Sequence, residues 1–159
     1  MTAVLRWTGL GKLISCYRYI YFNGPRTTLA LGLVLVLGVG AIHLDLLVTD
    51  QALARGVDSP IYLDVYFTLL FASALLAGLG MVNGRRPGWA LGSLVSAATI
   101  TMYVVSRVWG LPGLPLLVGW WDYPLGTVVL ALAAMFLGLH FSVVTGLNVA
   151  FPEQRDWHD

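Results

Sequence analysis

Four apolar segments, each long enough to cross a bilayer, occupy most of this 159-residue chain. About 20 consecutive apolar residues are needed to span some 30 Å of hydrocarbon as a helix, and each segment reaches that length. Because a backbone in lipid must satisfy its own hydrogen bonds, such segments fold as helices. The sequence therefore predicts an all-α fold, a four-helix transmembrane bundle over residues 27–145. Its spans are predicted at about 27–48, 61–82, 89–109 and 124–145.

The composition agrees with a membrane protein in contact with lipids. The chain is 58% hydrophobic and 11% charged, with a mean hydropathy of +0.79, whereas an ordinary soluble domain is about 25% charged. A net charge of +1 gives no basic footprint for nucleic acid, so we expect no nucleic-acid partner. The single cysteine, Cys16, excludes an intrachain disulfide and a thiolate metal cluster.

The distribution of Lys and Arg predicts the orientation. Only Arg55 and Arg107 fall on one side of the predicted spans. Positive residues concentrate in cytoplasmic segments, so we expect a multi-pass protein of the bacterial cytoplasmic membrane with both termini in the cytoplasm. The residues on the other, cytoplasmic side are Arg6, Lys12, Arg18, Arg26, Arg85, Arg86 and Arg155.

The segments that flank the bundle are predicted to be cytoplasmic. Residues 1–26 form an amphipathic interfacial segment, in which basic and aromatic residues suit anionic headgroups. It is either a simple anchor or a docking surface for a partner. Residues 146–159 form a cytoplasmic tail. The apolar face of the N-terminal helix carries Trp7, Leu10, Ile14, Tyr17 and Tyr21, at intervals of three and four residues.

Small residues recur at intervals of four on the predicted spans. Gly88 and Gly92 lie on the third span, and Ala134 and Gly138 lie on the fourth. Such spacing lets helix backbones approach closely in lipid, so we expect these residues to face neighbouring helices.

The loop of residues 110–123, GLPGLPLLVGWWDY, is irregular yet apolar. Because such backbone needs hydrogen-bond partners near lipid, we expect the loop to fold back as a lid over the outer end of the bundle or to meet a partner. Four aromatic residues would supply the outer aromatic belt: Trp109, Trp120, Trp121 and Tyr123.

Ionisable residues gather at the predicted outer end of the spans: His43, Asp45, Asp64 and Arg107. One interpretation is a structural ion pair of Arg107 with Asp64 or Asp45, because charges at membrane depth are usually paired. The other is an outward-facing polar pocket, in which His43, Asp45, Asp64 and Tyr103, near the outer end of the third span, act as ligands or proton carriers. There His43, Asp45 and Asp64 could bind copper or zinc once a partner completes the coordination shell. His43 and Asp45 lie roughly 200° apart around a helix, which weakens the metal site.

Haem is the other cofactor that histidines in a helix bundle could hold. His43 and His140 each lie about 24 Å along their spans from opposite membrane surfaces. The two side chains therefore occupy opposite leaflets, which disfavours a bis-His haem within one chain. We expect His140 to be a buried histidine bonded to Ser142, Thr145 or a carbonyl.

Several short motifs carry a resemblance over about residues 28–145: the run IHLDL at 42–46, a Tyr103-x-x-Ser106-Arg107-x-x-GLPG segment, and Trp121-Asp122. In these motifs the chain resembles a group of small four-span actinobacterial integral membrane proteins. The resemblance implies a four-helix fold with His43, Asp45 and Arg107 as signature positions. It implies no reaction and lends no catalytic residues.

Three classes of function remain open. The chain carries no GxSxG, HExxH, Walker or dinucleotide motif, which favours a non-enzymatic protein without excluding an enzyme. The leading prediction is a non-catalytic accessory subunit of a larger bacterial membrane complex, with other membrane subunits as partners. The alternatives are a metal- or cofactor-binding protein using the outer His/Asp cluster, and a small-molecule or lipid-binding bundle capped by the 110–123 loop.

Overall fold

A computed structural model describes residues 25–49 and 60–150 of the chain. The predicted amphipathic segment, apart from its last two residues, lies outside these ranges, and so does most of the predicted tail.

Four long helices make up the fold: α3 (Pro25–Thr49), α4 (Ile61–Val82), α5 (Arg86–Val108) and α6 (Pro124–Val144). A short 3-10 helix, η2 (Pro115–Leu117), lies between α5 and α6. All four long helices are long and apolar enough to cross a membrane. The structure thus confirms the predicted all-α four-helix bundle and a multi-pass membrane protein, and the helices begin and end within a few residues of the predicted bounds.

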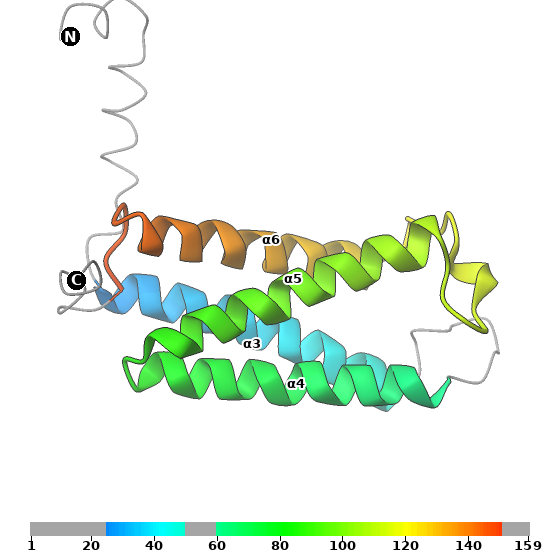
Figure 1. Ribbon diagram of the computed structural model, residues 1–159, viewed down its shortest axis with the longest axis horizontal. Coiled ribbons are helices and arrows are strands. Elements are labelled where there is room, and N and C mark those ends of the chain that lie inside the picture. The colour runs from blue at the N-terminus through cyan, green and yellow to red at the C-terminus, as the bar shows by residue number, and fades with distance from the viewer. Residues whose placement is uncertain (1–24, 50–59, 151–159) are drawn as a thin grey trace, which may run out of the picture.

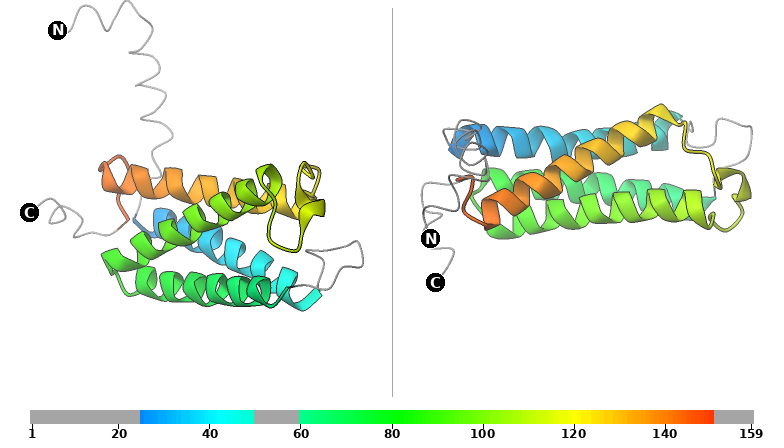
Figure 2. Two further views of the ribbon diagram at one scale, coloured as in Figure 1. Left: turned by 45° about the vertical axis from the view of Figure 1, so that its right-hand side comes forward. Right: turned by 90° about the horizontal axis from the view of Figure 1, so that it is seen from above.

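The helices form a closed up-and-down bundle (Figures 1 and 2). Helices α3 and α5 each pack against both α4 and α6, and they lie diagonally opposite each other. We call the end where Asn83–Arg85 joins α4 to α5 the hairpin end, and the end where residues 109–123 join α5 to α6 the capped end. Helix α3 begins, and α6 ends, at the hairpin end (Figure 1).

Local sequence signals explain where the helices begin and end. Gly84 adopts φ 68°, a left-handed conformation that glycine accepts at no cost, and this conformation reverses the chain between α4 and α5. Proline lies in the first turn of both α5 and α6, where its missing N–H breaks no helical hydrogen bond.

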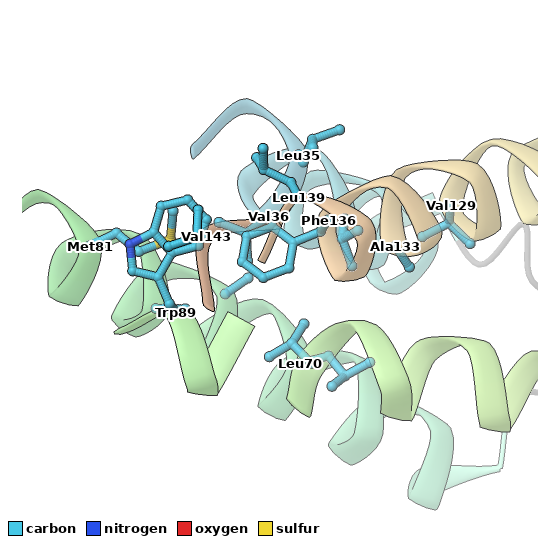
Figure 3. Close-up of a cluster of buried hydrophobic side chains, with 14 of the residues drawn as sticks. Leu35, Val36, Leu70, Met81, Trp89, Val129, Ala133, Phe136, Leu139 and Val143 are labelled. Atoms are coloured by element: carbon cyan, nitrogen blue, oxygen red, sulfur yellow. The ribbon is translucent and has the colours of Figure 1, made fainter. Parts of the chain in front are cut away.

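The hairpin-end half of the bundle is closely packed around Trp89 and Phe136, which are both fully buried (Figure 3). Their rings stack with centroids 5.8 Å apart and planes inclined by 25°. A Cβ on Gly92 would come closer than 3.0 Å to the ring of Phe136, and one on Gly88 would come as close to the α4 backbone. Glycine at these two positions therefore lets α5 approach α6 and α4, as the spacing predicts.

The small residues of α6 behave differently. Ala134 and Gly138 lie on the exposed face of that helix, and a Cβ on Gly138 would meet no atom within 4 Å. These two residues do not pack against the other helices of the bundle.

Candidate functional site

A cavity of about 80 Å³ opens inside the capped end of the bundle. Its walls come from α3, α4, α5, the beginning of α6 and the segment that joins α5 to α6. Leucine, phenylalanine, methionine and valine side chains make up much of the wall. The polar residues that line it are His43, Tyr66, Thr99, Tyr103, Ser106, Arg107 and Tyr123.

Helix α5 supplies more polar lining than any other element. Thr99, Tyr103 and Arg107 follow one another at intervals of four, so one face of α5 turns them all toward the cavity. Tyr103 lies against Gly126 of α6, where a Cβ would come closer than 3.0 Å to its ring. The absence of a side chain at Gly126 thus leaves room for the Tyr103 ring between α5 and α6.

Arg107 is the most unusual of these groups, because only 6% of its surface is exposed. Its guanidinium carbon lies 4.8 Å from the ring centre of Tyr103 and 5.3 Å from that of Trp120, and both contacts favour the cation. Within residues 25–49 and 60–150, neither Nε nor Nη1 of Arg107 has a hydrogen-bond partner. A buried charged donor without an acceptor is costly, so an acceptor placed at these two nitrogens would stabilise the site.

His43 enters the cavity from α3, and it is 3% exposed. Its Nδ1 lies 2.7 Å from the carbonyl oxygen of Val39. Because a carbonyl only accepts, Nδ1 carries the hydrogen of the neutral ring and Nε2 carries the lone pair. The rings of Tyr66 and Phe67 lie 5.9 and 5.8 Å from the imidazole, which fixes its orientation.

Tyr123 closes the cavity at the entry to α6. Its hydroxyl is buried and has no hydrogen-bond partner in the part of the chain that the structure describes. Burial and then the negative charge of Asp45 raise the pKa of Tyr123 above the ordinary tyrosine value, while Arg107 opposes this shift. The hydroxyl therefore stays protonated at neutral pH and offers a donor on the wall of the cavity that Arg107 also lines.

Residues 109–123, which we call the cap, pack on this end of the bundle. Leu114 and Leu117 are 1% and 6% exposed, and they join a cluster with Leu46, Leu63 and Phe67 of the helices. The cap follows the last turn of α5 and returns to α6 beside it (Figure 2).

Hydrogen bonds join the cap to α4 and α5. The hydroxyl of Tyr62 in α4 donates to the carbonyl of Pro112 at 2.7 Å. The backbone N–H of Gly119 donates to the carbonyl of Arg107 at 2.9 Å. The cap is therefore fixed both to α4 and to the helix turn that carries Arg107.

The four aromatic residues of the predicted outer belt divide into two pairs. Trp109 and Trp121 are 75% and 50% exposed, whereas Trp120 and Tyr123 are partly buried and pack against the apolar cluster below the cap. The first pair faces outward, whereas the second pair belongs to the interior of the capped end.

The predicted metal ligands are not brought together. His43 lies inside the bundle, Asp45 is exposed, and Asp64 is half-buried on α4 without lining the cavity. Among the residues described, no three His, Cys, Asp or Glu side chains form a group that could hold a metal. The copper or zinc site stays a prediction.

The predicted ion pair also stays a prediction. Neither Asp45 nor Asp64 provides a hydrogen-bond acceptor to Nε or Nη1 of Arg107. Arg107 instead lines the cavity together with His43.

His140 lies in the closely packed half, where its ring stacks on Trp89 at 5.8 Å. The expected hydrogen bond to Ser142, Thr145 or a carbonyl is wrong, because Nδ1 of His140 pairs with a side chain of another helix, and the residue is half-buried rather than buried. Nδ1 of His140 instead contacts the hydroxyl of Ser93 on α5. His43 and His140 belong to different halves of the bundle, His43 to the cavity and His140 to the core around Trp89.

Sequence reasoning placed Arg107 and Tyr103 at this end but missed Tyr66, Thr99 and Ser106 as parts of the site. The signal was present on α5, where polar residues recur at helical intervals through an otherwise apolar span.

Comparison with known proteins gives no match: no family model, no curated protein and no solved structure is significantly similar to this chain. The resemblance to small actinobacterial four-span proteins stays a prediction.

Proposed function

We propose that this protein binds a small amphipathic molecule in the cavity at the capped end of its membrane bundle. The observation that supports this proposal is that cavity, on which side chains from all four long helices and from the cap converge. Pockets for small molecules have mostly apolar walls with a few polar groups that fix orientation. The cavity has this composition.

The basic residues of the chain support an orientation for this site. Arg85 and Arg86 lie at the hairpin end, on the far side of the bundle from the cavity. By the positive-inside rule the hairpin end faces the cytoplasm, and the cap then faces the exterior or periplasm. The ligand reaches the site from the outer side of a bacterial cytoplasmic membrane.

The test is to identify the small molecules that co-purify with the full chain in an uncharged detergent, by extraction and mass spectrometry. Thr99→Leu inserts a larger apolar side chain into the cavity. Thr127→Leu is the matched control, because Thr127 is exposed on α6 and its hydroxyl also bonds to the carbonyl four residues earlier. We expect Thr99→Leu to lower the ligand-to-protein ratio and Thr127→Leu to leave it unchanged. An equal ratio in both variants and the wild type would contradict the proposal.

An accessory subunit of a larger membrane complex is the second candidate. Ala134 and Gly138, one turn apart on the exposed face of α6, support it because small residues allow another helix to approach closely. The test is purification from the native membrane in a gentle detergent, with the wild type compared with Gly138→Leu. Loss of a stoichiometric membrane subunit from the variant would support this candidate, and a protein that purifies alone would contradict it.

A further inference from the structure

We infer that the ligand of the capped cavity carries one carboxylate, which accepts hydrogen bonds from Arg107, and a short apolar tail. This inference rests on the proposed binding function and specifies the chemical class of the ligand. Arg107 lines the cavity, and only 6% of its surface is exposed. Its Nε and Nη1 have no hydrogen-bond partners among the described residues.

The charge of the site favours an anion. Tyr103 and Trp120 hold the guanidinium by their ring faces, which leaves its planar N–H edges for an acceptor. The buried hydroxyl of Tyr123 is a further donor on the wall of the same cavity. A carboxylate accepts charge-assisted hydrogen bonds from a guanidinium, and these are roughly twice as strong as neutral ones.

The same residues favour a monoanion over a phosphate dianion. Among the described residues that line this cavity, Arg107 is the one Lys or Arg, so one negative charge balances it. A second negative charge would have no cation among these lining residues, at a large desolvation cost. The effect of Asp45 on Tyr123 places a further negative charge near this end of the bundle, which disfavours a dianion more.

The apolar part of the cavity wall favours a hydrocarbon tail on the ligand. Leu63, Phe67, Met102 and Val129 are apolar residues of the cavity wall. Contact between these side chains and a short hydrocarbon chain would remove apolar surface from water, which favours binding. A linear carboxylic acid of about six carbons combines both features, and the cavity volume of about 80 Å³ has room for more than one water-sized group.

The experiment is calorimetric titration of the full chain, in an uncharged detergent, with hexanoate and with its neutral isostere hexanamide. We expect hexanoate to bind roughly tenfold or more tightly than hexanamide, because only the carboxylate is charged. Palmitate in the same titration tests the length of the tail. Weaker binding of palmitate than of hexanoate supports a short free acid, and tighter binding of palmitate would contradict the short tail and assign the site to a fatty acid of the membrane.

Variants test the role of the guanidinium. Arg107→Gln should lower the affinity for hexanoate to that for hexanamide and leave the affinity for hexanamide unchanged. Arg107→Lys, which keeps the charge, should retain part of the preference for hexanoate. Arg85→Gln is the matched control, because Arg85 is exposed at the opposite end, and it should leave both affinities unchanged.

Three further outcomes would overturn the inference. Equal affinities of the wild type for hexanoate and hexanamide would exclude the charged contact while leaving the proposed binding function standing. Tighter binding of inorganic phosphate than of hexanoate would assign the site to a free phosphate. If neither hexanoate nor hexanamide binds, the inference is wrong, and the co-purification of ligands with Thr99→Leu then decides separately whether the cavity binds another class of molecule.

Discussion

The two halves of this bundle are built from the same four helices but packed in different ways. In the hairpin-end half, Trp89 and Phe136 are fully buried and stacked, and Gly88 and Gly92 bring the helices together. In the capped half, side chains of all four helices line a cavity, and a buried arginine in its wall has no acceptor for two of its nitrogens among the residues that the structure describes. Close packing at one end supplies stability, and this leaves the other end able to keep a costly polar cavity.

The contrast does not depend on buried polar atoms alone. The closely packed half also encloses polar atoms that have no partner within residues 25–49 and 60–150, Oγ1 of Thr28 and Nε1 of Trp89 among them. These groups are neutral, and leaving a neutral donor unpaired costs less than leaving a charged one unpaired. The charged group at the capped end is therefore the one whose burial most needs a functional explanation.

The largest expected effect is on the closely packed half. Phe136→Ala removes a fully buried ring from the contact with Trp89 and leaves a cavity. We expect it to lower the free energy of unfolding by about 3 kcal/mol, near the low end for such changes because lipid adds little hydrophobic drive. Phe141→Ala is the matched control, since Phe141 is 67% exposed on the same helix. Unfolding of the purified protein by a denaturing detergent measures both, and equal losses would contradict the contrast between the halves.

Next in size is the effect at the helix contact of Gly88. Gly88→Ala places a Cβ against backbone atoms of Gly80 and Met81, which cannot turn aside as a flexible side chain can. We expect a loss of about 2 kcal/mol, as for other overpacked contacts. Gly138→Ala is the control, because it meets no atom within 4 Å and replaces a helical glycine; it should raise stability by about 0.5–1 kcal/mol. A neutral Gly88→Ala would mean that α4 and α5 are not held at this distance.

The sequence predicts the regular helices of this molecule better than it predicts the irregular cap. The spans are predicted well because length and hydropathy decide them in lipid. The inward direction of Arg107 was predictable from its helical spacing to Tyr103 and Thr99. The partial burial of Trp120 and the exposure of Trp121 were not predictable, because the backbone of the cap is irregular and has positive φ at Gly110, Gly113 and Gly119. The cavity itself depends on how those side chains pack, which no spacing encodes.

The stability of an Arg107 variant distinguishes a structural ion pair from an arginine that awaits a ligand, and the expected change is smaller. If Arg107 lacks a protein acceptor, Arg107→Met removes unpaired donors as well as its contacts with two rings, and the two losses largely offset each other. We expect the ligand-free stability to change by no more than about 1 kcal/mol. Breaking a buried ion pair costs about 3–5 kcal/mol. A loss of that size in both Arg107→Met and Asp64→Asn would establish the ion pair and remove the argument for a carboxylate ligand.

The smallest expected effect concerns the cap. Tyr62→Phe removes the hydroxyl that donates to the carbonyl of Pro112 and keeps the ring. Because Tyr62 is only partly buried and water can replace the bond, we expect global stability to fall by about 0.5–1 kcal/mol. The local effect on the cap is larger, since this bond joins the middle of the cap to α4. Hydrogen exchange should therefore speed up at the N–H of Leu114 and Gly119 while the amides around Phe136 exchange as before. Uniformly faster exchange in both halves would mean that cap and core open together, and the two halves would then be one cooperative unit rather than a stable end and a functional one.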